Sequence, residues 1–276
     1  MKFDFSFGNE THNKPKGFLY VGQDNYYIGP KDGTAMYLYS DSATSCVIVI
    51  IEGKNEAGQP IVALTHLSRL ERFQTFFNLI ETKFVGEIAV FAQGANPSHL
   101  SNNPNDTTSL RNTNSLLTWI NSHTSTDKEG NIEIPPADTY KHKFYIKSLT
   151  LSLGLGNPQK DDRGCFGIDL STMIVSNKRF SLTLEDRDST GGQQTLFCVF
   201  GLKVNPQIHL HYVLSDFSKE EVDVLVIAAK KDKWEGIAKM TDAEILDNYS
   251  STPQYEAPWF CDTMRESSNY VINYKG

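Results

Sequence analysis

Short apolar runs separated by polar loops occupy the first half of the chain and predict strands. Residues 45–51, SCVIVII, form an uninterrupted β-branched run that is typical of a strand buried on both faces. The loop EGKNEAGQP follows, with two glycines and a proline, and a second run, IVALTH, ends at His66. The two runs therefore predict a hairpin.

The apolar pattern changes from continuous runs to helical spacing after His66. Apolar residues recur every three or four positions over residues 67–84, and Gly86 stands where such a helix would stop. Ser68 and Glu71 have the spacing of a capping box at its start. The pattern then predicts a buried strand and a shorter helix, at residues 87–92 and 110–120.

Beyond a polar, proline-bearing excursion at residues 122–142, most of the chain consists of β-rich runs punctuated by glycine or charge. A final helix is predicted at about residues 233–248. The predicted fold class is α+β: a layered sandwich of mixed strands with two flanking helices over residues 17–178. Residues 179–276 are predicted to form a β-rich C-terminal extension or a small second domain.

Composition narrows the functional classes. The formal net charge is -7, and the basic residues are scattered, which does not favour binding to nucleic acid or to an anionic membrane. No run approaches the roughly 18 apolar residues of a membrane helix. The N-terminus lacks an apolar signal region, so we expect a cytoplasmic protein, or one delivered without an N-terminal Sec signal. The four widely spaced cysteines are then expected to be reduced.

The predicted hairpin carries the candidate chemistry. If it is centred near Glu56, Cys46 lies directly opposite His66, and opposed Cβ atoms are about 4.5–5.5 Å apart. An adjacent imidazolium would lower the thiol pKa and give a nucleophilic thiolate at neutral pH. A slip of one residue would send the two side chains to opposite faces.

The segment from Ser40 to Val47, SDSATSCV, resembles the G-S-C-V segment of CheD-type chemoreceptor glutamine deamidases. In that family a hydroxyl residue stands six positions before the nucleophilic cysteine, and the catalytic histidine ends the next strand. Thr44 replaces the family's glycine. Later segments resemble the family in order and spacing over residues 17–178: GEIAVFAQGAN, LRNTNSLLTWI and DDRGCFGIDLSTMIV. The same core is similar to cytotoxic-necrotizing-factor-like toxins, including Burkholderia lethal factor.

This resemblance implies hydrolysis of a glutamine side-chain amide on a protein substrate, by a bacterial effector or toxin. It makes Cys46 the nucleophile and His66 its base, with Ser40 orienting the imidazole. Backbone groups near Thr44 and Ser45 would stabilise the oxyanion and bind the substrate. No cofactor and no metal are expected, and the oligomeric state is left open.

Two alternatives remain at this level. One is a non-catalytic protein-binding module on the same fold, and the other is a thiol peptidase or transglutaminase-like enzyme. His209 and His211 share a strand face, a common start for a metal site, but no third ligand lies at a telling spacing. His123 is predicted to be a loop residue, and no partner is assigned to it.

Overall fold

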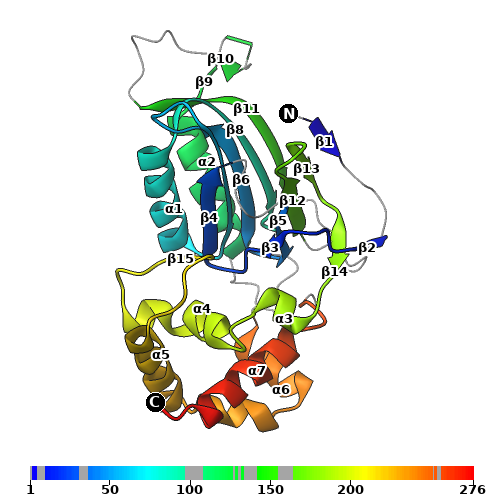
Figure 1. The fold of residues 1–276 in the computed structure, drawn as a ribbon, viewed down its shortest axis with the longest axis vertical. Helices are drawn as coiled ribbons and strands as arrows, with labels where there is room; N and C mark the ends of the chain where they lie inside the picture. The colour runs from blue at the N-terminus through cyan, green and yellow to red at the C-terminus, as the bar shows by residue number, and fades with distance from the viewer. Residues whose placement is uncertain are drawn as a thin grey trace.

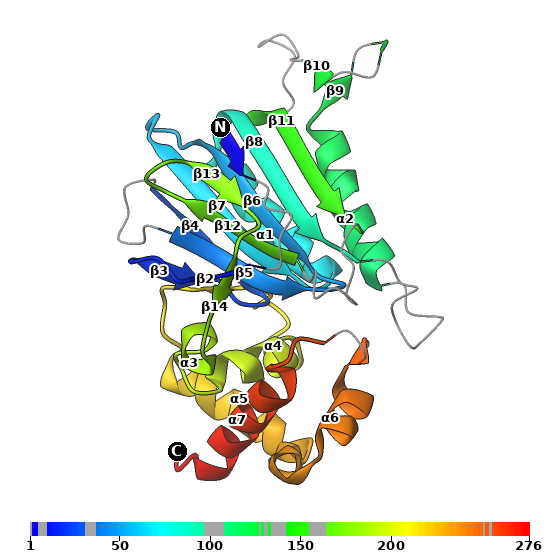
Figure 2. The same cartoon turned by 90° about the vertical axis from the view of Figure 1, so that its right-hand side faces the viewer.

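The computed structural model describes most of the chain and shows two stacked β-sheets, a layer of two helices and a separate group of helices (Figures 1 and 2). The described residues are 2–4, 10–30, 37–96, 108–126, 128–129, 132–133, 142–154, 164–250, 252–253 and 256–276. Most of the predicted excursion at residues 122–142, and the start of the DDRGCFG segment, lie outside them.

The larger sheet has six strands in the order β11-β8-β6-β7-β4-β15. Its centre is the antiparallel β6–β7 pair, so the predicted hairpin is confirmed. The strands are β4 (Asn25–Pro30), β6 (Val47–Lys54), β7 (Pro60–Leu67), β8 (Val85–Gly94), β11 (Phe144–Leu153) and β15 (His211–Tyr212).

The second sheet has five strands in the order β1-β13-β12-β5-β3, and two further strand pairs, β14–β2 and β10–β9, lie outside both sheets. The strands of this sheet are β1 (Lys2–Asp4), β3 (Phe18–Tyr20), β5 (Tyr37–Ala43), β12 (Gly164–Asp169) and β13 (Ile174–Ser176). The separate pairs are β2 (Thr11–Asn13) with β14 (Arg179–Ser181), and β9 (Ser125–Thr126) with β10 (Ile132–Glu133).

Alternate residues of β6 and β7 enter two different cores, because successive strand side chains point to opposite faces. Val47 and Val49 pack against the helix layer, formed by α1 (Leu70–Lys83) and α2 (Thr108–Ser122). Ile48 and Ile50 pack between the two sheets. The strand is thus buried on both faces, as its continuous apolar run predicts.

The mixed α+β class and the two flanking helices are confirmed. The predicted capping box is wrong in detail: the N-cap of α1 is Arg69, and no side chain caps it. The hydroxyl of Ser68 instead donates to the buried carboxylate of Asp24, 2.7 Å away. The Ser68 hydroxyl therefore binds the buried Asp24 carboxylate and does not cap the helix.

The predicted β-rich C-terminal extension is wrong, because residues 184–276 are mainly helical. Among the described residues of this C-terminal helical region, only the two-residue strand β15 joins a sheet. Its helices are α3 (Leu184–Arg187), α4 (Gln193–Val204), α5 (Lys219–Lys231), the 3₁₀ helix η4 (Trp234–Lys239), α6 (Asp242–Tyr249) and α7 (Phe260–Asn273). None of the helices in the described residues is long and apolar enough to cross a bilayer.

Tertiary packing explains why β-branched and aromatic sequences form helices here. Val222, Leu225, Val226 and Ala229 of α5 enter one core that also takes residues of α4, η4, α6 and α7. Their spacing is helical, and Ser218 forms a capping box at the start of α5. The helical region lies below the two sheets in both views (Figures 1 and 2), and Figure 1 labels β15 at the adjoining end of the larger sheet.

Candidate active site

His66 lies near the end of β7 and points into the space between the two sheets. Its Nδ1 atom shares a hydrogen bond of 2.9 Å with the hydroxyl of Ser40, from β5 of the other sheet. Both residues are buried, His66 with 3% and Ser40 with 0% of its surface exposed. Nε2 of His66 has no hydrogen-bond partner among the described residues. The hydrogen bond to Ser40 therefore fixes Nδ1, and Nε2 is the ring nitrogen that could exchange a proton with another group.

Cys46 lies just before β6, and the predicted register is wrong by two positions. His66 stands opposite Ile48, because the β6–β7 turn places Lys54 opposite Pro60. The hairpin is therefore centred on Ala57 and not on Glu56. A shift of two keeps the side chains on the same face, and Cys46 belongs to the same inter-sheet core as Ile48. Cys46 and His66 are diagonal neighbours on one face rather than an opposed pair.

The turn that carries Cys46 is fixed by groups from outside it. Main-chain N–H groups of Ala95 and Asn96 donate to the carbonyls of Cys46 and Thr44, at 2.6 and 2.7 Å. The side chain of Asn112, on α2, donates to the carbonyl of Ser45 at 2.8 Å and to that of Ser68 at 3.0 Å.

Asn112 is a site residue that the sequence reasoning did not single out. The helical pattern does not indicate that this asparagine is buried and donates two hydrogen bonds, because both acceptors lie in distant segments. It ties the turn before β6 to the residue after β7, so the peptide groups beside Cys46 have a defined orientation.

Gly94 makes close packing against this turn possible. Its φ is +117°, and a Cβ atom there would lie 2.3 Å from the carbonyl oxygen of Cys46. Only glycine fits such a backbone and such an approach. The glycine in the QGAN segment therefore has a steric role beside the candidate nucleophile.

Burial controls the protonation of both groups. It lowers the pKa of His66 to about 3, so the imidazole is neutral at physiological pH. Burial also raises the pKa of the Cys46 thiol well above its ordinary value, and the nearby charges of Asp24 and Glu256 raise it further. The expected imidazolium–thiolate pair is thus not found. The resting state is a neutral thiol near a neutral imidazole.

An exposed side chain lies beside the thiol. Cys46 is 8% exposed, and its Sγ donates to the side-chain Oε1 of Gln23 over 3.8 Å. Gln23 is itself exposed, in the turn that precedes β4. The thiol of Cys198, on α4, donates to the main-chain carbonyl of Gln23 at 2.8 Å. The C-terminal helical region therefore meets the site at Gln23.

A cavity of about 630 Å³ opens next to this turn. Gly22 and Asn25, on either side of Gln23 and Asp24, line it together with Tyr20 and with Gln194 of α4. Cys46 and His66 are not among its lining residues. The cavity thus lies beside the turn that carries Gln23.

The remaining candidates occupy structural positions. The Nε2–H of His211 donates to the carbonyl of Ser215 at 2.8 Å, and its ring stacks on Phe217. Cys165 and Cys261 are buried cysteines that form no disulfide. His123 lies in the bend after α2, so its predicted place in a loop is confirmed, and its Nε2 contacts the carboxylate of Glu81.

The fold and the site define a layered α+β protein with a thiol, an imidazole and a hydroxyl gathered at one end of the inter-sheet space. Residues 9–84 of the 276 match the model of a family described as protein N-terminal asparagine amidohydrolase. At the coarse level this match supports the predicted class, a hydrolase of amide groups. Comparison with curated protein sequences gives no match.

The family match corrects the predicted kinship. The CheD-type and cytotoxic-necrotizing-factor-like deamidases form a different family from the one matched. That resemblance rests on the order and spacing of segments around one cysteine and one histidine, with little identity. Spacing of this kind recurs wherever two adjacent strands carry the same side-chain types, so it did not distinguish the families.

Proposed function

We propose that the protein hydrolyses the side-chain amide of an asparagine at the N-terminus of a protein, releasing ammonia and leaving aspartate. The observation that carries the proposal is the match over residues 9–84, which contains Ser40, Cys46 and His66. These three residues come from two sheets and converge on one space. The expected glutamine is replaced as substrate by asparagine, since the matched family's description names asparagine.

The chemistry requires one proton relay. Ser40 accepts from the Nδ1–H of His66, which leaves the Nε2 lone pair free to take the thiol proton of Cys46. The thiolate attacks the amide carbon, and main-chain N–H groups near Ser45 bind the oxyanion. His66 gives its proton to the departing ammonia. Water then hydrolyses the thioester to aspartate and restores the thiol.

The contact between Gln23 and Cys46 supports this proposal. Its own side-chain amide already lies beside the Sγ atom of Cys46, so the space there accepts the group that the substrate would bring. Because Gln23 is exposed, its side chain can swing out without disturbing the core. The asparagine side chain then enters from the neighbouring cavity and takes the place of the Gln23 amide.

The test measures ammonia release from four matched peptides, with asparagine or glutamine at the N-terminus or inside the chain. We expect release from N-terminal asparagine alone. Cys46→Ser should lower kcat/KM more than about 10³-fold, because removing a nucleophile disables the whole relay. His66→Ala should lower kcat/KM to a similar extent, and Ser40→Ala should lower it less. Circular dichroism checks that each variant folds.

Cys261→Ser is the matched control, since it removes another buried thiol far along the sequence and should keep activity. Full activity of Cys46→Ser would end the proposal. Release from an internal glutamine would restore the sequence-based glutamine hypothesis. No release from any peptide, with equally slow alkylation of all four cysteines, would favour the non-catalytic binding module.

A further inference from the structure

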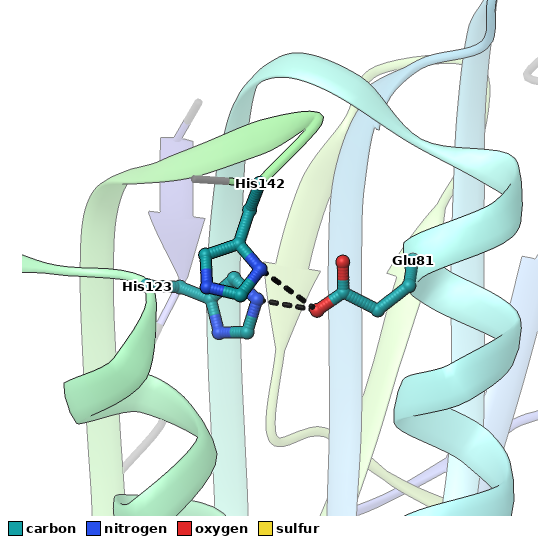
Figure 3. Close-up of side chains that lie close together, drawn as sticks. All are labelled: Glu81, His123 and His142. Atoms are coloured by element: carbon teal, nitrogen blue, oxygen red, sulfur yellow. Dashed lines mark hydrogen bonds and ion pairs between the residues drawn. The ribbon is translucent and has the colours of Figure 1, made fainter. Parts of the chain in front are cut away.

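Three side chains at the far end of the larger sheet from Cys46 point toward one another (Figure 3). Glu81 lies in the last turn of α1, His123 follows α2, and His142 precedes β11. One ligand atom from each lies within 4.8 Å of the other two. The carboxylate oxygen Oε1 of Glu81 contacts Nε2 of His123 and lies 3.7 Å from Nδ1 of His142.

The orientation of His123 is fixed by groups behind it. Its Nδ1 donates to the main-chain carbonyl of Trp119 at 2.8 Å. Its ring stacks on Phe144, and the ring centroids are 4.9 Å apart. A carbonyl only accepts hydrogen bonds, so Nδ1 carries a hydrogen, and Nε2 is the ring nitrogen that faces Glu81. Nε2 of His123, Nδ1 of His142 and the Glu81 carboxylate are thus three potential ligand atoms that face one another.

We propose that Glu81, His123 and His142 bind a divalent zinc ion. Two imidazoles and a carboxylate are ligands that zinc prefers, at about 2.0–2.2 Å. The bond from His123 to the Trp119 carbonyl is the outer contact that metal-bound histidines usually make. Glu81 and His142 have about a third of their side chains exposed, 32% and 35%. Water therefore reaches the site and can supply a fourth ligand.

The position of the cluster gives the ion a structural role. It would join the end of α1, the end of α2 and the start of β11, three segments far apart in sequence. Glu81 lies eleven residues beyond Leu70, the first residue of α1, and so about 17 Å along the helix from the His66 end. The zinc site is therefore independent of the proposed amidohydrolase chemistry, and it should stabilise the helix layer on the sheet.

The experiment uses the full-length protein, stripped of metal with a chelator and then titrated with zinc. We expect one zinc per chain by calorimetry, and a rise in Tm of about 5 °C at a hundredfold excess over Kd. His142→Gln and Glu81→Gln should both lose the binding and the rise in Tm. His142 is partly exposed, so its variant should fold, and Glu81→Gln provides a second ligand deletion.

Two control variants separate this site from other histidines and thiols. His12→Gln removes a histidine outside the cluster and should bind zinc like the wild type. Cys46→Ser should also bind normally, which distinguishes the site from the proposed active site. Cobalt substituted for zinc should show no sulfur-to-metal charge-transfer band. Equal zinc binding by the wild type and His142→Gln, or no binding by the wild type, would overturn the proposal.

Discussion

At the scale of single residues, His66 decides how the candidate site responds to pH. Its imidazole is buried between two sheets, with Ser40 on one nitrogen and no partner among the described residues for the other. A protonated ring in this place would be buried, without a carboxylate contact among the described residues to stabilise it. Desolvation alone therefore lowers its pKa to about 3.

The folded state should lose stability in acid through this residue. His66 titrates near 6.5 when unfolded and near 3 when folded. Below pH 6.5 only the unfolded state takes up the proton, so its contribution is fully present above pH 6.5 and is lost as pH falls. The slope is at most about 1.4 kcal/mol per pH unit.

Urea unfolding of the wild type and of His66→Gln between pH 4.5 and 7.5 measures this effect. The variant should show a shallower fall in unfolding free energy below pH 6.5. Identical slopes in the two proteins would show that His66 is not the buried neutral group described here.

At the scale of elements, a buried ion pair joins the turn before β4 to the first turn of α1. Nε of Arg72 lies 3.2 Å from the carboxylate of Asp24, and both side chains are 0% exposed. Ser68 donates to the same carboxylate, and the N–H of Asp24 donates to the carbonyl of His66. Burial nevertheless raises the pKa of Asp24, so the pair exists at a desolvation cost. The junction holds the end of β7 against α1.

Asp24→Asn should lower the unfolding free energy by about 3–5 kcal/mol, because it leaves the Arg72 charge buried without compensation. The double variant Asp24→Asn with Arg72→Met should be more stable than the single variant, since the lone charge is then removed. Asp262→Asn, at an exposed ion pair of α7, is the control and should hardly change the unfolding free energy. A double variant less stable than Asp24→Asn would contradict this account.

At the scale of the whole molecule, Arg187 fastens the C-terminal helical region to the smaller sheet. It pairs with Asp41 of β5 at 2.9 Å, and its guanidinium lies 3.6 Å from the ring centroid of Trp259. Asp41 also accepts from the hydroxyl of Tyr20 at 2.8 Å. Asp41 follows Ser40 directly in β5, so this contact reaches the neighbour of a candidate catalytic residue.

We expect Arg187→Ala to lower the unfolding free energy by about 3–5 kcal/mol, because Asp41 is only 3% exposed and loses its cation. Arg187→Lys should recover only part of the loss, since it keeps the charge without the planar stack on Trp259. Lys219→Ala, at an exposed ion pair within α5, is the control variant and should hardly change the unfolding free energy. Thermal melts of the three variants test this prediction. An unchanged Tm for Arg187→Ala would show that the contact between Arg187 and Asp41 does not stabilise the protein.

Local sequence patterns predict the parts of the fold where apolar periodicity, capping and propensity all favour the same secondary structure. The run at residues 45–51 could only be a buried strand next to a glycine-bearing loop, and the spacing over residues 67–84 could only be an amphipathic helix. In the C-terminal helical region the signals competed. The apolar run of α4 has no N-terminal side-chain cap, and its period is ambiguous. For α5 the capping box at Ser218 and the helical spacing compete with the β propensity of its valine and isoleucine residues.

The sequence by itself determined the elements of the sandwich core and the residue types available for chemistry, because these follow from local periodicity and composition. Only the tertiary structure decided which atoms meet. A turn two residues longer or shorter around Ala57 changes the partner of His66, and Ser40 reaches His66 only because two sheets stack. Burial then sets the protonation of the thiol and the imidazole. Contacts, register and desolvation arise from packing between distant segments, and no local pattern encodes them.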